Sequence, residues 1–392
     1  MKIALIILHA DPARGGAERY TFDLAQALAR RGHEVSLIAS SFADRPAGVE
    51  CIELTPPRSA RTRTSQYDRF CDALAAHTAS GGYDVTHAML PLPACDVYHP
   101  HAGVAADAIL TGHRKHASKF RRILAKIFSR WSPRRRRFAQ VERDLLTRPS
   151  RPITICLSNY VAGTVRAHYD LNESDLATLF NSVDLAKYDP ATRPGERRDY
   201  RQQLGATDTT IIALIVAQDF ARKGLREAIE AIARLNADEE RIPTTPMLLI
   251  VGKDNPKPYQ RLAARLGVDV RMRFVGPATD MYPPYAAADY FVLPTRHDPC
   301  SLVVLEALAM GLPVISTRQN GACEIMTPGQ HGFVLDNAAD IRGLATGMLS
   351  LADAETRLMM SNACLALRPK LSYDTHLATL EEIYTRAIAR RA

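Results

Sequence analysis

Short strand-like runs alternate with longer amphipathic stretches along the chain. The runs that we predict to be strands include 2–8, 34–39, 83–88, 151–158, 210–217, 247–252, 273–277 and 290–293, and further strands begin at 96, at 175 and at 312. Between them, apolar residues recur at helical spacing, for example in 16–31 and 226–235. Strands that alternate with helices in this way predict an α/β fold with parallel sheets.

Length and composition predict two domains. The chain has 392 residues, of which 46% are hydrophobic and 23% charged, as in globular proteins. We place the boundary in the turn after residue 181, which gives an N-terminal domain 1–181, a C-terminal domain 182–372 and a terminal helix 373–392. The first apolar run is too short to cross a membrane, and no signal-peptide cleavage site follows it.

The cysteines give no sign of a disulfide framework or a metal site. There are seven, an odd number, and none forms a Cys-x-x-Cys pair or clusters with histidines at metal-ligand spacing. We therefore expect reduced thiols in a cytoplasmic protein.

Positive charge is concentrated in one segment. The formal net charge is +8, yet residues 114–151 alone hold fourteen Lys or Arg against two carboxylates, so the rest of the chain is net acidic. Inside this segment an apolar stripe at helical spacing is flanked by cations. The stripe is Phe120, Ile123, Leu124, Ile127, Phe128 and Trp131, and the cations include Lys119, Arg121, Arg122, Lys126 and Arg130. Pro133 closes this helix, and four arginines follow it.

A cationic amphipathic helix with a tryptophan is typical of a segment that lies on an anionic membrane surface, so we predict a membrane-facing segment at about 113–151. Alternatively, the stripe packs on its own domain while the charges stay in water. Nucleic-acid binding is disfavoured, because the chain has one tryptophan, no RNP-like or zinc-finger pattern, and an acidic remainder.

The most informative stretch runs from Tyr290 to Ser316. A buried strand is followed by a polar loop, by Ser301 as a plausible N-cap and by a helix from Leu302 to about Met310. The free amides of a helix's first turn make an anion site. Asp298 and Glu306 would repel a phosphate but suit hydroxyl groups, which donate hydrogen bonds to carboxylates. Phosphate beside hydroxyls describes a sugar nucleotide. The alternative is an ordinary helix start, where the dipole favours acidic residues.

Two other features suit a diphosphate. Arg222 and Lys223 precede a glycine at the end of a predicted strand, where a point charge and a bidentate fork can hold phosphate oxygens. Gly15 and Gly16 lie between the first strand and helix, and would let backbone amides come close to a pyrophosphate. The glycine pair could equally be a simple tight turn.

The pattern formed by Asp298 and Glu306 resembles the acidic-x7-Glu signature of the GT4 family, retaining glycosyltransferases of the GT-B fold. The strings at 15–19 and 180–184 resemble that family too, the second with Phe180 and Ser182 as departures. This chain departs from the pattern with Asp298 where glutamate is usual, and with Cys300 and Ser301 where Phe-Gly or Ala-Gly is common. The motif Asp-Phe-x-Arg-Lys-Gly at 219–224 is similar to the WaaG-like lipopolysaccharide core glucosyltransferases, which also carry a basic membrane-facing segment.

The resemblance implies two Rossmann-like doubly wound domains facing a cleft, with the terminal helix crossing back to the N-domain. It also implies roles for individual residues. The diphosphate would be held by Arg222, Lys223, Gly15, Gly16, Cys300, Ser301, Leu302 and Val303, the ribose by Glu306, the sugar by Asp298, and the base by Phe274 and Val275. The acceptor side would include Glu18 and the histidines that follow the strand near Val97. Of these, His101 is favoured over His99 as the one facing the donor sugar, although both histidines could be structural.

We therefore predict a retaining transferase that moves a hexose from a nucleotide sugar, by preference a UDP-sugar, to a membrane-associated glycan or glycolipid such as lipopolysaccharide core. No metal or other cofactor is expected, since no Asp-x-Asp occurs and Arg and Lys can neutralise the leaving group. The partners would be the donor, the acceptor and the inner face of the plasma membrane. A soluble GT4 enzyme with a small acceptor is the alternative. A nicotinamide-dependent dehydrogenase is disfavoured by the lack of GxGxxG, and a nucleic-acid-binding protein is remote.

Overall fold

The computed structural model describes residues 1–57, 59–101, 103–107, 132–237 and 245–391. These residues form two compact units. The N-unit comprises the described residues up to Asn181 together with the chain from Tyr373, and the C-unit comprises those from Ser182 to Ser372. The predicted stripe at Phe120, Arg121, Arg122, Ile123, Ile127, Phe128 and Trp131 lies outside the described residues.

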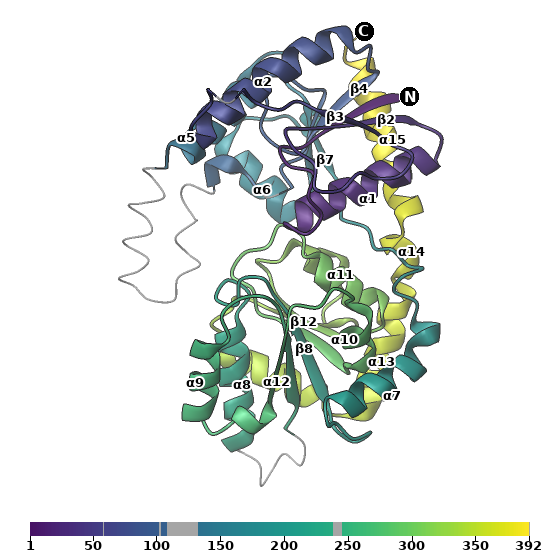
Figure 1. Cartoon of the computed structure of the whole chain (residues 1–392). Helices are drawn as coiled ribbons and strands as arrows, with labels where there is room; N and C mark the ends of the chain where they lie inside the picture. The colour runs from purple at the N-terminus through teal and green to yellow at the C-terminus, as the bar shows by residue number, and fades with distance from the viewer. Residues whose placement is uncertain (58, 102, 108–131, 238–244, 392) are drawn as a thin grey trace. The chain divides into compact units, whose positions relative to one another are not determined.

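The N-unit is built on a seven-stranded parallel sheet with the order β3-β2-β1-β4-β5-β6-β7 (Figure 1). Its strands are β1 (Lys2–Ile6), β2 (Glu34–Ala39), β3 (Glu50–Glu53), β4 (Val85–Ala88), β5 (Val97–Tyr98), β6 (Ile153–Cys156) and β7 (Leu176–Thr178). Its helices are α1 (Gly16–Arg30), α2 (Arg63–Ser80), α5 (Pro133–Thr147), α6 (Asn159–His168) and α15 (Tyr373–Ala389). Strand β1 is central and almost wholly buried, as its unbroken apolar run requires.

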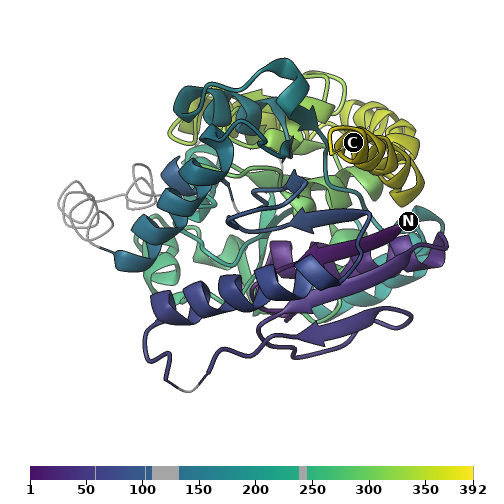
Figure 2. The ribbon, with the colours of Figure 1, turned by 90° about the horizontal axis from the view of Figure 1, so that it is seen from above.

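Helix α15 belongs to the N-unit although it is the end of the chain. Its apolar face, with Leu380 and Tyr384, joins the core formed by β1 and by Leu24 and Leu28 of α1. The end of α15 lies next to the start of β1 in both views (Figures 1 and 2). A helix with so many buried contacts is part of the folded core of this unit, not a loose tail.

The C-unit contains a six-stranded parallel sheet with the order β10-β9-β8-β11-β12-β13. Its strands are β8 (Ile212–Val216), β9 (Met247–Val251), β10 (Met272–Gly276), β11 (Tyr290–Leu293), β12 (Val314–Thr317) and β13 (Gly332–Leu335). Its helices are α7 (Arg193–Gln203), α8 (Leu225–Ala237), α9 (Lys257–Arg265), α10 (Tyr282–Ala287), α11 (Leu302–Ala309), α12 (Ile341–Ser350), α13 (Ala354–Ala366) and α14 (Arg368–Leu371). Strand β8 carries no charged residue and is buried along most of its length.

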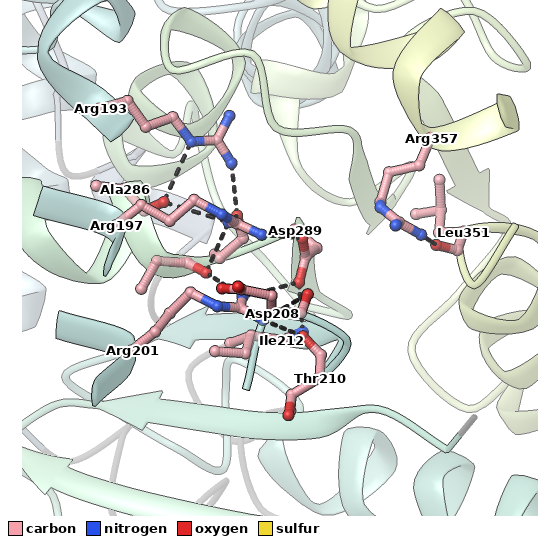
Figure 3. A network of polar contacts seen from close by, with 12 residues as sticks. Arg193, Arg197, Arg201, Asp208, Thr210, Ile212, Ala286, Asp289, Leu351 and Arg357 are labelled. Atoms are coloured by element: carbon pink, nitrogen blue, oxygen red, sulfur yellow. Dashed lines mark hydrogen bonds and ion pairs between the residues drawn. The ribbon is translucent and has the colours of Figure 1, made fainter. Parts of the chain in front are cut away.

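Three arginines on one face of α7 hold α10 in place (Figure 3). Arg193 and Arg197 donate to the carbonyls that end α10, and Arg201 donates to the Ala287 carbonyl at 2.9 Å. The Asp289 carboxylate accepts from Arg197 and Arg201, and also from the amide of Ile212 at 2.7 Å. Cations at the carboxyl end of a helix complement its dipole, so this network fixes α10 against β8.

The predicted strands are present, with ends that differ by at most two residues, because residues at the ends of the predicted runs do not all pair in the ladder. Pro133, which we expected to close a helix, is the first residue of α5. At this position the missing N–H of proline costs nothing. The four arginines after it therefore form the first turn of a helix that the sequence analysis did not predict, because a run of charge hides helical periodicity.

Candidate functional site

The loops after β8 and β11 lie at the topological switch point of the C-unit sheet. From β8 the sheet order runs outward through β9 to β10, and from its neighbour β11 it runs the other way to β13. In open α/β sheets, ligands bind outside the carboxyl ends of the strands at this point. The loops that leave these two strands carry Arg222 and Lys223 on one side and Asp298 on the other.

Lys223 and Asp298 form a buried ion pair across the switch point. The Lys223 Nζ donates to the Asp298 Oδ2, and each side chain is about one-tenth exposed. Burial favours the neutral acid, but the charges of Lys223 and Arg222 outweigh it and lower the pKa of Asp298. Burial lowers the pKa of Lys223, and the Asp298 carboxylate opposes that effect. Asp298 is therefore ionised at neutral pH.

Arg222 provides a second cation beside this pair. Its Nη1 donates to the His297 carbonyl at 3.2 Å, and its Nε lies 3.9 Å from the Asp219 carboxylate. The side chain is one-third exposed, so the guanidinium combines a fixed position with access to solvent. A lysine and an arginine held together in this way can share the charge of a diphosphate.

Gly224 allows the two loops to approach so closely. Its φ is +80°, and a Cβ there would lie 2.1 Å from the Pro294 carbonyl oxygen. The amide of Arg296 and the hydroxyl of Thr295 both donate to the Arg222 carbonyl. Only glycine fits between these hydrogen-bonded segments, and this contact sets the position of Lys223 relative to Asp298.

Glu306 on α11 is positioned by a buried tyrosine. The Tyr285 hydroxyl donates to the Glu306 Oε2 at 2.7 Å and also lies 3.2 Å from the Val303 carbonyl. Burial, together with the Glu306 charge, raises the pKa of Tyr285, so this phenol stays a donor. Because Tyr285 belongs to α10, the arginines of α7 indirectly support Glu306.

The start of α11 depends on a residue that the sequence analysis missed. Asn320 accepts from the amide of Ser301 at 3.3 Å, and its amide nitrogen donates to Ser316. Ser301 is the N-cap of α11, as predicted, but its hydroxyl makes no capping hydrogen bond. The amides of Leu302 and Val303 lie in the first turn, where a helix offers them no carbonyl.

Three other residues that we predict to bind the sugar-nucleotide donor differ in burial and in position. Cys300 is buried in the loop before α11. Phe274 and Val275 lie on β10, the edge strand, which β9 separates from β8. Phe274 is half-buried and Val275 is exposed. The structure therefore pairs Lys223 with Asp298 directly, holds Arg222 on the carbonyl of the preceding residue, His297, and places Phe274 and Val275 two strands away.

In the N-unit the two candidate histidines belong to a buried aromatic cluster. His99 is wholly buried and its ring stacks on His87, whereas His101 keeps a small exposure and its Nε2 lies 3.0 Å from the Asn181 Oδ1. Tyr20 of α1 packs on both histidines and is hydrogen-bonded to His376 of α15 at 2.8 Å.

Tyr20, His87 and His376 could not be predicted from the sequence, because residues this distant in the chain give no spacing signal. Burial lowers the pKa of His99 far below its ordinary value, so its imidazole is neutral. The greater exposure of His101 agrees with the preference for it over His99, which stays a prediction.

Gly15, Gly16 and Glu18 begin α1. Gly15 is the N-cap and its backbone is fully extended, a conformation that any residue adopts. A Cβ on Gly15 would meet only the Glu18 Oε2, at 3.0 Å. The Glu18 carboxylate also lies 3.7 Å from the Arg14 guanidinium. No backbone strain therefore demands the first glycine of this pair.

Two absences concern the described residues alone. Among them, no cluster of three or more His, Cys, Asp or Glu has the arrangement of a metal site. None of their helices is long and apolar enough to span a membrane.

Comparison with known proteins identifies the class. A family described as Glycosyltransferase Family 4 matches residues 14–187, and one described as Glycosyl transferases group 1 matches residues 210–354. The solved structure of WaaG, a glycosyltransferase involved in lipopolysaccharide biosynthesis, superposes with a TM-score of 0.78 at 22% identity and covers 97% of this chain and 98% of that one. The chain has the GT-B fold and belongs to the GT4 family of glycosyltransferases.

Curated relatives differ in their acceptors. The lipopolysaccharide glucosyltransferase WaaG of Escherichia coli (strain K12) is 26% identical over 322 residues, which is 82% of each chain. A D-inositol 3-phosphate glycosyltransferase of Corynebacterium efficiens is 25% identical over 431 residues, which covers 99% of this chain and 96% of its own. The structure of Anabaena HepE in complex with UDP-glucose has a TM-score of 0.67 at 18% identity and covers 98% of each chain.

Proposed function

We propose that this protein is a retaining, metal-independent glycosyltransferase that moves a hexose from a UDP-sugar to a glycan or glycolipid acceptor such as lipopolysaccharide core. The observation that carries the proposal is the pairing of Lys223 with Asp298, beside Arg222, at the switch point of the C-unit sheet. Cations for a diphosphate and a carboxylate for hydroxyls are thereby brought to one place. The preference for UDP rests on the resemblance and on the HepE complex.

Each side chain has a definite task in this proposal. Lys223 and Arg222 hold the diphosphate and neutralise the charge that grows on it as the glycosidic bond breaks. The amides of Leu302 and Val303 at the start of α11 hold a phosphate oxygen. Glu306 accepts from ribose hydroxyls, and Asp298 accepts from hydroxyls of the sugar. The base lies along β10 at Phe274 and Val275.

Retention of configuration follows from attack on the face that the phosphate leaves. The departing phosphate oxygen takes the proton of the acceptor hydroxyl, while the acceptor oxygen forms the new bond to the anomeric carbon and the old bond to phosphate breaks. This route needs no pair of acid and base carboxylates, and the buried Asp298 beside a lysine is poorly suited to carry a proton. His101 and Glu18 would contact the acceptor side.

Two acceptor classes are supported by different observations. A membrane glycolipid is supported by the similarity to WaaG and by the basic apolar stripe of the sequence at 119–131. We accordingly place the protein in the cytoplasm, on the inner face of the plasma membrane. A phosphorylated polyol is the second candidate, since a D-inositol 3-phosphate glycosyltransferase matches nearly the whole chain.

The test is titration calorimetry of the purified protein with UDP, GDP, NAD and a panel of UDP-sugars, without added metal. We expect micromolar UDP binding that is lost in Arg222→Gln and kept in Arg226→Gln, a matched change in the first turn of α8. Binding of NAD instead, or equal affinity for UDP in both variants, would overturn the donor assignment. Vesicles with and without phosphatidylglycerol test the membrane part, using wild type and the double variant Phe128→Ser and Trp131→Ser.

A further inference from the structure

A second group of cations lies in the N-unit, on residues to which the proposed function assigns no role. Arg14 follows β1, Arg63 begins α2, and Arg134 is in the first turn of α5. In the N-unit sheet β1 and β4 are neighbours from which the order runs outward in opposite directions, so the loop after β1 lies at the switch point of this sheet. This is the position at which an open α/β sheet binds its ligand.

The packing of α2 on α5 brings Arg63 and Arg134 together. The rings of Tyr67 and Phe138 stack with centroids 4.4 Å apart, and the Arg137 Nε donates to the Asp68 Oδ1 at 2.7 Å. One helical turn before Tyr67 stands Arg63, and one turn before Phe138 stands Arg134. Side chains four residues apart share a face of a helix. Both arginines therefore lie on the faces by which α2 and α5 pack together. The Arg134 guanidinium lies over the Phe138 ring, 5.2 Å from its centroid.

The charges in this group are poorly compensated. Within the described residues neither Arg63 nor Arg134 forms an ion pair, and Arg14 has only Glu18, at 3.7 Å. Partial burial and repulsion by Arg63 and Arg14 lower the pKa of Arg134. His9 at the end of β1 experiences the same field, since burial and then Arg14 and Arg134 lower its pKa, with only Asp11 opposing. A bound anion would relieve this repulsion.

We propose that Arg14, Arg63 and Arg134 bind a phosphate group of the acceptor. Three guanidiniums from separate elements can each present parallel N–H donors to a phosphate, and two helix starts add positive dipole ends. The inference rests on the proposed function, in which the N-unit receives the acceptor, and it narrows that acceptor to a phosphate-bearing one. The phosphate can come from a phosphorylated glycan or polyol, or from a lipid headgroup.

The test measures phosphate binding while the donor site is full. Wild-type protein saturated with UDP is titrated with inorganic phosphate, with myo-inositol 3-phosphate and with myo-inositol, by calorimetry. We expect both phosphates to bind and myo-inositol not to. Arg134→Gln should weaken binding about tenfold, the loss expected for one charge-assisted contact. The control is Arg135→Gln, the same change on the next, exposed residue of α5, which should leave the affinity within about twofold.

A second experiment, with lipid vesicles, identifies the source of the phosphate. Vesicles of phosphatidylglycerol in phosphatidylcholine are added to the same proteins. Vesicle binding that Arg134→Gln weakens and that myo-inositol 3-phosphate displaces assigns the site to a lipid headgroup. Soluble phosphate binding without such vesicle binding assigns it to a phosphorylated glycan or polyol. Either result supports the phosphate site.

Two results would overturn the inference: equal affinities in Arg134→Gln and Arg135→Gln, or no phosphate binding by the UDP-loaded wild type. Failure of the donor assignment is distinguishable from these, because it appears as loss of UDP binding while phosphate binding still depends on Arg134. Circular dichroism of both variants checks that the helices are intact.

Discussion

Lys223 and Asp298 are 75 residues apart in the chain, yet the lysine ammonium donates directly to the aspartate carboxylate in a buried position. The loops that carry them leave adjacent strands, β8 and β11, and Gly224 lets the loops touch. Because both side chains are withdrawn from water, each charge is stabilised mainly by the other. A change to either residue acts on the stability of the C-unit as well as on the site.

Lys223→Ala should consequently abolish transfer and also destabilise the protein. Removing one partner of a buried ion pair leaves the other charge uncompensated, at a cost of about 3–5 kcal/mol. Urea unfolding measures the stability, and release of UDP from a UDP-sugar in the presence of acceptor measures the activity.

A double variant separates the two effects. Lys223→Met with Asp298→Asn removes both charges, so it should recover most of the lost stability and none of the activity. Lys257→Ala, on the exposed start of α9, is the control for loss of a lysine in the same unit. Wild-type turnover in Lys223→Ala would remove this lysine from the site.

Glu306 should determine the preference for ribose over deoxyribose. If its carboxylate accepts from a ribose hydroxyl, wild type should bind UDP about tenfold more tightly than 2′-deoxy-UDP, the value of one hydrogen bond to a charged group. Glu306→Gln should reduce that ratio to below about threefold. Tyr285→Phe should reduce it partly, because the Glu306 carboxylate loses the donor that positions it. An unchanged ratio in Glu306→Gln would assign the ribose to another residue.

Gly224 should tolerate alanine far less than Gly205 does. Both have positive φ, +80° and +69°, so both alanine variants carry a backbone cost of about 1 kcal/mol. Only at Gly224 would the new Cβ collide, with the Pro294 carbonyl oxygen, whereas at Gly205 there is open space. Gly224→Ala should therefore lower the free energy of unfolding by several times as much as Gly205→Ala does. It should also lower the affinity for UDP. Equal unfolding midpoints would show that the loops can separate freely.

The elements of this fold were largely predictable, because strands buried on both faces leave uninterrupted apolar runs such as those at β8, β9 and β11. Candidate site residues were predictable where they follow such runs directly, as Arg222, Lys223 and Asp298 do. The contacts that these residues make could not be predicted. The Lys223–Asp298 pair requires β8 to lie beside β11, and the hydrogen bond from Tyr20 to His376 joins residues 356 apart. Sequence spacing gives no information on strand order. Asn320 and Tyr285 escaped prediction for the same reason.

The N-unit should lose stability as the pH falls below about 6.5. Burial lowers the pKa of His87 to about 3 and that of His376 to about 4, from an ordinary value of 6.5. In the unfolded chain these imidazoles bind protons below pH 6.5, whereas in the folded unit they stay neutral, so acid favours unfolding. Each contributes up to about 1.4 kcal/mol per pH unit, and the effect ends where the folded groups titrate.

Urea unfolding of wild type and His376→Phe between pH 7 and pH 4 measures this dependence. The variant removes one titrating group, and it also leaves the Tyr20 hydroxyl and the Phe180 carbonyl without their partner. It should therefore be less stable than wild type at pH 7, yet its stability should fall less steeply with acid, by about 1.4 kcal/mol per pH unit. The difference in slope is the decisive quantity, since a purely structural role for His376 would lower stability equally at every pH. Parallel curves for the two proteins would show that His376 is not the buried neutral group that its surroundings indicate.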